Sequence, residues 1–417
     1  MTSPPADGAA GAPLSRNAAW AMLLVLLSGF ALSQAYRTVT AIIAVALQTD
    51  FGLSPSALGL FASLFALTFG AVQLFMGVGI DLYGLRRTVL LTAPLSIVGA
   101  AVSFWSPSYA WLLAGQALIG LGCAPAFLAC TVFIARHFPA AQFAAVSGIS
   151  LGLGGVGMLF TGSPLAWLVE QYGWRSGFAT LGLLSMLSWL LIAWKVHEPA
   201  PDANAGPRQS WLAATREFGV LLTQPYSWGI LAMGLVAYAS FLTLRGLWLG
   251  PLLMERQGWS LVASGHLALV VSLISLVSPG IFGRLDPGPL RRRRLLVTTT
   301  SVMALLYAAL GLLHTGWLTV ALIIVIVTIS GGSALQYAHV RSSYPPEATG
   351  RAMAVLTMAM FLGAALMQWL TGLLASWAVH LGFDPFAAVM LGIAAMLCLG
   401  AGLFQTLPVS QRLAKSA

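Results

Sequence analysis

Long apolar stretches recur from one end of this chain to the other, and they limit its possible folds more than any other feature. Many are at least as long as the roughly 18 residues that a helix needs to cross a bilayer. Charged residues make up only 7% of the sequence, against about 25% in a typical soluble domain. The chain is therefore predicted to be an all-α membrane protein.

Twelve transmembrane helices are expected, in two six-helix halves. Connections are short except at 197–225, which is rich in Pro, Ala, Gly and Asp and is predicted to be a cytoplasmic linker. The halves are 18–196 and 226–407, flanked by cytoplasmic tails at 1–17 and 408–417. The helices are expected at 18–47, 56–79, 88–105, 110–134, 144–168, 176–196, 226–254, 262–283, 295–313, 317–338, 351–377 and 386–407.

Basic residues are distributed unequally between the two sides of the predicted membrane domain. The tails and the loops that follow even-numbered helices hold 16 of the 20 Lys and Arg residues, whereas the opposite loops hold Arg175 and Arg256. Positive residues favour the cytoplasmic side, so both termini are predicted to be cytoplasmic and the protein to lie in a bacterial inner membrane. The four arginines at 291–294 are interpreted as a topology anchor on anionic lipid, and no nucleic-acid partner is expected.

The second half of the sequence repeats features of the first. FGLSPSALG at 51–59 aligns with QGWSLVASG at 257–265, and the matching pairs Gly52/Gly258 and Ser54/Ser260 are each 206 residues apart. Two six-helix halves in a parallel repeat describe the architecture of the major facilitator superfamily, which this chain resembles over essentially its whole length.

A loop motif supports this resemblance. GVGIDLYGLRRT at 77–88 is similar to the family signature between helices 2 and 3, except for a leucine where a basic residue is usual. In the second half, GRLDPGPLRRRR keeps the aspartate and the arginines. The resemblance implies that Asp81 and Asp286, with Arg86 and Arg291, control conformation, each carboxylate favouring the positive start of helix 11 or helix 5 in the outward-open state. A simple loop cap is the alternative.

Two further helices bear on the type of transporter. GQALIGLGCA at 115–124 resembles a motif that carries an arginine in proton-coupled drug exporters, and here Gln116 takes that place. Helix 5, SGISLGLGGVGMLFTGSP, matches the proline–glycine motif of antiporters only loosely, and its glycines are interpreted as a surface on which helices approach closely. Both departures lower the expectation of drug or metabolite efflux by proton antiport, which remains an alternative.

Two arginines fall inside predicted membrane helices, where a charge is costly. Arg37 lies in helix 1, and Arg245 lies 208 residues later at the matching position of helix 7. The first helices of the two halves face each other in this architecture, so the pair is predicted to clamp an oxyanion between two guanidinium groups.

The alternative for each arginine is a structural pair with a buried carboxylate. The sequence argues against it because the acidic residues map to loops or helix ends, with Glu170 the nearest candidate. They are Asp7, Asp50, Asp81, Glu170, Glu198, Asp202, Glu217, Glu255, Asp286, Glu347 and Asp384.

One arginine in helix 1 and one in helix 7 resembles the organophosphate:phosphate antiporter branch of the superfamily, and related organic anion carriers also use a helix 1 arginine. The resemblance implies that Arg37 and Arg245 bind the substrate anion. That branch places a functional histidine in helix 5, and this helix 5 has none. Phosphate and carboxylate substrates both remain open.

The sequence as a whole is interpreted as a monomeric secondary transporter of a small anion that works by alternating access. A transporter-like ligand sensor is a further alternative. No enzymatic constellation, metal site or cofactor is expected. Further candidate substrate contacts, each also interpretable as a helix–helix contact, are Gln34, Tyr238, Trp248, Gln116, Gln336 and Tyr337.

Overall fold

The computed structural model describes residues 15–139, 142–197, 219, 221–408 and 410. Within these residues it contains twelve helices that are long and apolar enough to cross a membrane, as predicted. Most of the predicted linker and most of each predicted tail lie outside the described residues.

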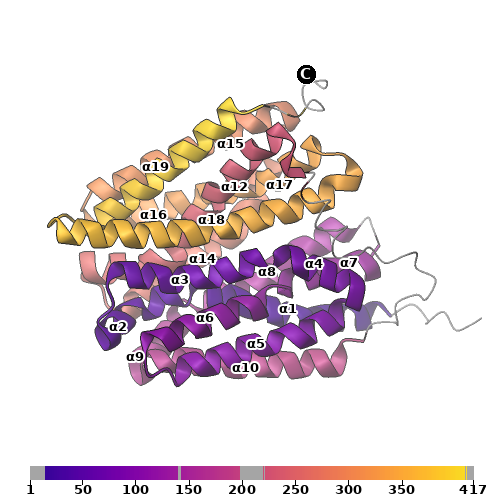
Figure 1. The fold of residues 1–417 in the computed structure, drawn as a ribbon, viewed down its shortest axis with the longest axis horizontal. Coiled ribbons are helices and arrows are strands. Elements are labelled where there is room, and N and C mark those ends of the chain that lie inside the picture. The colour runs from indigo at the N-terminus through magenta and orange to yellow at the C-terminus, as the bar shows by residue number, and fades with distance from the viewer. Residues whose placement is uncertain (1–14, 140–141, 198–218, 220, 409, 411–417) are drawn as a thin grey trace, which may run out of the picture.

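The first six spans form one group of helices, and the last six form a second group beside it (Figure 1). The first group comprises α1 (Arg16–Thr38), α2 (Thr40–Phe51), α3 (Pro55–Ala71), α4 (Gln73–Tyr83), α5 (Leu85–Phe104), α6 (Tyr109–Cys123), α7 (Ala126–His137), α8 (Phe143–Phe160), α9 (Ser163–Tyr172) and α10 (Trp174–Lys195). The second comprises α12 (Pro225–Thr243), η2 (Leu244–Trp248), α13 (Leu249–Pro251), η3 (Leu252–Arg256), α14 (Leu261–Arg284), α15 (Pro289–Leu312), α16 (Gly316–Ser330), η4 (Gly331–Ala334), α17 (Leu335–Ser343), α18 (Pro346–His380) and α19 (Pro385–Thr406).

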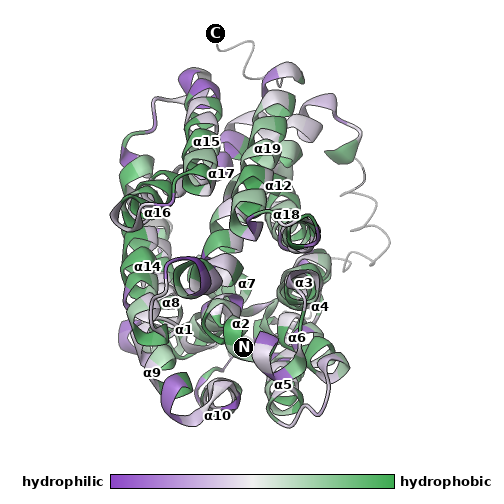
Figure 2. Ribbon diagram, turned by 90° about the vertical axis from the view of Figure 1, so that its left-hand side faces the viewer, coloured by the Kyte–Doolittle hydropathy of each residue, from purple (hydrophilic) through white to green (hydrophobic). Residues whose placement is uncertain are grey.

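The described chain begins and ends at the same end of the molecule, which we call the terminal end; the opposite end is the distal end (Figure 1). Figure 2 looks at the distal end and shows mostly hydrophobic residues along both groups of helices. Many large apolar side chains are exposed on the outer surface, as a protein in a lipid solvent requires.

The internal repeat appears in the local backbone. Gly52 and Gly258 both adopt the left-handed conformation, with φ of 61° and 69°, which glycine adopts at little cost. Two residues later, Ser54 and Ser260 cap the next helices, α3 and α14, by accepting a hydrogen bond from a backbone N–H three residues on. The two halves therefore enter their second membrane helices in the same way.

Six membrane helices that the sequence predicts as continuous are interrupted within the described residues: helices 1, 2, 4, 5, 7 and 10. Three of these interruptions lie beside the two intramembrane arginines. Helix 1 breaks at Val39, between α1 and α2, and helix 5 breaks at Thr161–Gly162, between α8 and α9. Helix 7 changes to π-helix at Leu244–Trp248. In helix 5 the break precedes Pro164, which lacks a backbone N–H and starts a new helix readily.

The two halves approach each other most closely toward the distal end. A side-chain carbon added at Gly59 of α3 would lie 2.7 Å from the Gln368 carbonyl oxygen of α18. Gly250 of α13 is so close to Ala41 of α2 that such a carbon would overlap the Ala41 carbonyl. The backbone N–H of Ser56 also donates to Ser376 Oγ across the halves, at 2.8 Å.

Toward the terminal end the facing helices of the two halves are further apart. Gly148 and Gly152 of α8, and Gly280 and Gly283 of α14, have no atom within 4 Å of an added side-chain carbon. Nearer the distal end, Gly155 and Gly162 of the same helix pair contact Leu276 and Leu269. The conformation is therefore closed at the distal end.

Candidate functional site

Arg37 lies in the last turn of α1, beside the break at Val39. Its guanidinium carbon lies 4.6 Å from the ring centroids of both Phe69 and Phe361. Phe69 belongs to α3 and Phe361 to α18, and their centroids are 4.2 Å apart. The cation therefore sits where helix 2 of one half meets helix 11 of the other, held by cation–π contacts.

Neutral side chains orient the Arg37 guanidinium. Its Nη1 donates to Gln34 Oε1 at 2.6 Å, and its Nη2 donates to Ser33 Oγ at 3.2 Å. The Nε atom has no hydrogen-bond partner among the described residues, and Arg37 is only partly buried. None of the ion pairs among the described residues includes Arg37. Because a guanidinium carries five N–H groups, several donors remain for an oxyanion.

Arg245 lies in the π-helical segment and is 0% exposed. Its Nη2 donates to the carbonyl oxygens of Met158 and Thr161, at 3.1 and 3.2 Å, and to Thr161 Oγ1 at 3.3 Å. Its Nε donates to Ser272 Oγ at 3.1 Å, while Nη1 has no partner among the described residues. The partners of this buried cation are thus carbonyl and hydroxyl oxygens.

The break in helix 5 explains why these carbonyls are available. The Gly162 N–H donates to the Leu159 carbonyl at 3.1 Å, and the Met158 carbonyl loses its usual intrahelical donor. The last carbonyls of a helix need outside donors and carry partial negative charge, which favours a cation. Arg245 caps the end of α8 in this way.

Arg37 and Arg245, the predicted anion clamp, lie at matching positions of helices 1 and 7, but their side chains lie between different pairs of helices. Gly246 lies against helix 1, so a side-chain carbon there would be 2.8 Å from the Arg37 carbonyl oxygen. The backbones of helices 1 and 7 therefore meet at the predicted level. The Arg37 side chain lies between helices 2 and 11, whereas Arg245 lies between helices 5 and 8, the symmetry-related pair. No described hydrogen-bond partner is common to both, although Thr161 also bonds Thr38 Oγ1, at 2.6 Å.

Two predicted contacts lie near Arg37. The Tyr238 ring centroid is 5.8 Å from that of Phe361, and the Tyr337 hydroxyl contacts the sulfur of Met360, the residue before Phe361. The Tyr337 hydroxyl bonds Thr357 Oγ1 at 2.9 Å. The amide nitrogen and oxygen of neighbouring Gln336 are buried without a partner among the described residues.

Two other predicted contacts are engaged or buried elsewhere. The Trp248 indole N–H donates to Thr371 Oγ1 at 2.9 Å, and its ring packs edge-on against Phe386. Gln116 is buried in α6. Sequence reasoning missed Phe69 and Phe361, because an apolar residue in a membrane helix carries no signal of its contact with a cation. The TGSP sequence after α8 is a signal for the helix break at Thr161.

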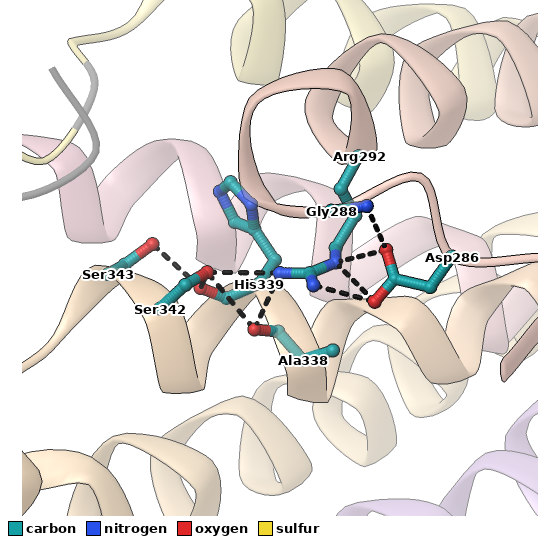
Figure 3. A network of polar contacts seen from close by, with 7 residues as sticks. All are labelled: Asp286, Gly288, Arg292, Ala338, His339, Ser342 and Ser343. Carbon is teal, nitrogen blue, oxygen red and sulfur yellow. Dashed lines mark hydrogen bonds and ion pairs between the residues drawn. The ribbon is translucent and has the colours of Figure 1, made fainter. Parts of the chain in front are cut away.

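The predicted gating residues lie at the terminal end. The Asp81 side chain is outside the described part of the structure, and Arg86 donates to the Ala193 carbonyl of α10 at 2.9 Å. The Asp286 carboxylate pairs with Arg292, at 2.6 Å, and accepts from the Gly288 N–H (Figure 3).

The ion-pair partner of Asp286 is Arg292, a residue that was not among the predicted gating residues. The helix α15 begins at Pro289, and its first turn directs Arg292 inward, where it also donates to the Ala338 carbonyl of α17, while Arg291 is exposed. Hydrogen bonds from Arg292 hold the pKa of the Asp286 carboxyl below its usual range. This network lies within the second half.

The family model described as Major Facilitator Superfamily matches residues 25–368. The chain belongs to this superfamily. It is a family of membrane transporters, and the predicted resemblance is confirmed.

Individual relatives are distant. The chain is 22% identical over 365 residues to the probable galactarate/D-glucarate transporter GudP of Bacillus subtilis. The aligned residues cover 79% of this chain and 80% of GudP. It is 25% identical over 169 residues to the probable sulfoacetate transporter SauU of Cupriavidus necator, covering 40% and 39%. As with SauU, the chain spans less than two thirds of several curated relatives that it matches.

A solved structure supports the fold. The crystal structure of a D-xylose–proton symporter superposes with a TM-score of 0.74 at 17% identity, covering 94% of this chain and 99% of the symporter.

Proposed function

We propose that this protein is a secondary active transporter for a small anion of the carboxylate or phosphate type. It works as a monomer in a bacterial inner membrane, with both termini cytoplasmic, and alternates access between the two sides. The relatives named for the anions galactarate, D-glucarate and sulfoacetate support an anionic substrate.

The observation that carries the proposal is the state of Arg37. It is a mid-span cation, partly exposed, oriented by neutral groups and carrying unused donors. The Phe69 and Phe361 rings, with centroids 4.2 Å apart, both contact the guanidinium from one side, so its edge, where the N–H groups suit paired oxygens, is left for an anion. Arg245 supplies the second guanidinium of the clamp in a conformation in which it has left the α8 carbonyls.

The test is binding of a panel of organic and inorganic anions to purified protein, followed by thermal shift and by labelled ligand. Arg37→Lys keeps the charge but loses the planar fork and the stacking surfaces, so affinity should fall by about tenfold or more, ~1.4 kcal/mol. Arg256→Lys is the matched control, because Arg256 pairs with Asp384 at the distal end. Full affinity in folded Arg37→Lys protein would contradict the proposal.

A further inference from the structure

Arg245 is one of several arginines in the described structure that donate to carbonyls at a helix end, and three others show the usual arrangement. Arg86 donates to Ala193 of α10, and Arg256 donates to the carbonyls of Leu310 and Gly311 at the end of α15. Arg293 donates to three carbonyls around the end of α19, at 2.7 to 2.9 Å. These three arginines and their helices lie in the same half. Arg245 alone of the four reaches into the opposite half.

The Arg245 cap lies in the part of the molecule where the two halves are in contact. The seam between α8 and α14 is closed from Gly155 to the distal end and open at Gly152, toward the terminal end. Met158 and Thr161, the residues that Arg245 holds, lie within the closed part. Ser272 strengthens the same junction, because its hydroxyl contacts both Arg245 Nε and the Met158 carbonyl.

We propose that Arg245 is a latch that holds the distal end shut in the ligand-free protein. Opening the distal end separates helix 5 of the first half from helices 7 and 8 of the second. This movement breaks three hydrogen bonds donated by one buried cation. Such charge-assisted bonds are the strong ones, and a buried donor that loses its acceptor pays its desolvation cost.

The latch has a consequence for transport that rests on the proposed function. A bidentate oxyanion takes Nη1 and Nη2 of Arg245 together, and Nη2 cannot bond the α8 carbonyls and that anion at once. An anion that recruits Arg245 therefore removes the restraint on distal opening, and substrate binding and release of the latch become one event.

The experiment measures distal opening directly in full-length protein in lipid nanodiscs, without any anion. Spin labels are placed at Ser108 and Thr315, exposed residues in distal loops of opposite halves, in a background whose three cysteines are replaced by alanine. Pulsed electron resonance then gives the distance distribution. Arg245→Gln should raise the longer-distance population by about tenfold over the parent protein, as the loss of strong hydrogen bonds predicts.

Arg256→Gln is the matched control, since it removes an arginine cap that stays within one half, and it should leave the distances unchanged. Arg245→Lys, which keeps the charge but not the fork, should shift the population in the same direction by less, and serves if the glutamine variant does not fold. Distance distributions of both Arg245 variants that coincide with the parent would overturn the latch. Anion binding by Arg37→Lys tests the proposed function separately, so the two failures are distinguishable.

Discussion

At the scale of single residues, two arginines related by the internal repeat have acquired different surroundings. Arg37 has aromatic faces, neutral hydrogen-bond acceptors and partial exposure. Arg245 is fully buried and is compensated by the carbonyl end of a broken helix. The protein thus carries one intramembrane cation that is partly exposed and one whose charge is stabilised by the opposite half.

A third charged residue gives a prediction about pH. The folded-state pKa of Asp286 is lowered, so its ion pair with Arg292 stabilises the protein above the unfolded pKa of about 4, and this stability is lost as the pH falls through the folded pKa. Asp286→Asn should lower the melting temperature at pH 7 by a few degrees, for a part-buried pair worth about 1–2 kcal/mol.

The pH series checks the sign of this effect. The difference in melting temperature between Asp286→Asn and the parent protein should shrink as the pH falls below about 4, because the parent carboxylate is then neutralised too. Glu170→Gln, at an exposed position of α9, is the control and should have little effect at any pH. A difference that stays constant down to the lowest pH would contradict the assignment.

At the scale of elements, helix breaks and glycines position the candidate site. Hydropathy predicted all twelve spans, because their length and composition follow from the thickness of the bilayer. It missed the interruptions of six spans, among them the breaks at Val39 and Thr161–Gly162 and the π-helical segment, because such interruptions leave the apolar composition unchanged. The directions of the side chains could not be predicted either. The sequence placed Arg37 and Arg245 at the same depth in the membrane, but it could not show that Arg37 points between helices 2 and 11 and Arg245 between helices 5 and 8.

The glycines of helix 5 were predicted to form a close-packing surface, and the structure confirms close approach at its distal part. Gly148, Gly152, Gly155 and Gly162 fall on one face by the helical period. Two of them contact helix 8, and two face open space at the terminal end. This pattern suits a seam that closes at one end while it opens at the other.

Substitutions at Gly250 of helix 7 and at Gly152 of helix 5 should favour opposite conformations. In Gly250→Ala the new methyl group overlaps the Ala41 carbonyl, so distal closure becomes strained by about 1–3 kcal/mol and the distance between labels at Ser108 and Thr315 should lengthen. Gly152→Leu fits the present conformation but obstructs closure of the terminal end, so the distance should stay short.

Transport by both glycine variants should be slow, because each disfavours one of the two states that the cycle needs. Gly402→Ala is the control, since an added carbon at this α19 position meets nothing within 4 Å. Transport at the parent rate by Gly152→Leu would show that the terminal ends of helices 5 and 8 never meet.

At the scale of the whole molecule, the charge of Arg245 in the second half is stabilised by the first half. In the distal-closed conformation the α8 carbonyls compensate Arg245. Opening the distal end without substrate leaves this cation among apolar helices, and an unpaired buried charge costs of order several kcal/mol even after relaxation. Since every ~1.4 kcal/mol slows a step tenfold, the empty carrier should reorient slowly. A bound anion takes the place of the carbonyls and lowers this barrier.

The cycle should therefore be an exchange of anions, with proton symport only where the proton travels with the substrate or on a group such as Glu170. The measurement is uptake of a labelled anion, identified by the binding panel, into proteoliposomes that are either empty or preloaded with the unlabelled anion, without a pH gradient. Preloading should accelerate uptake by about tenfold or more, because the loaded carrier then makes both crossings. Proteoliposomes with Arg37→Lys protein provide the background rate. Equal initial rates into empty and preloaded vesicles would show that the empty carrier returns freely, and that neither the latch nor the buried charge limits the cycle.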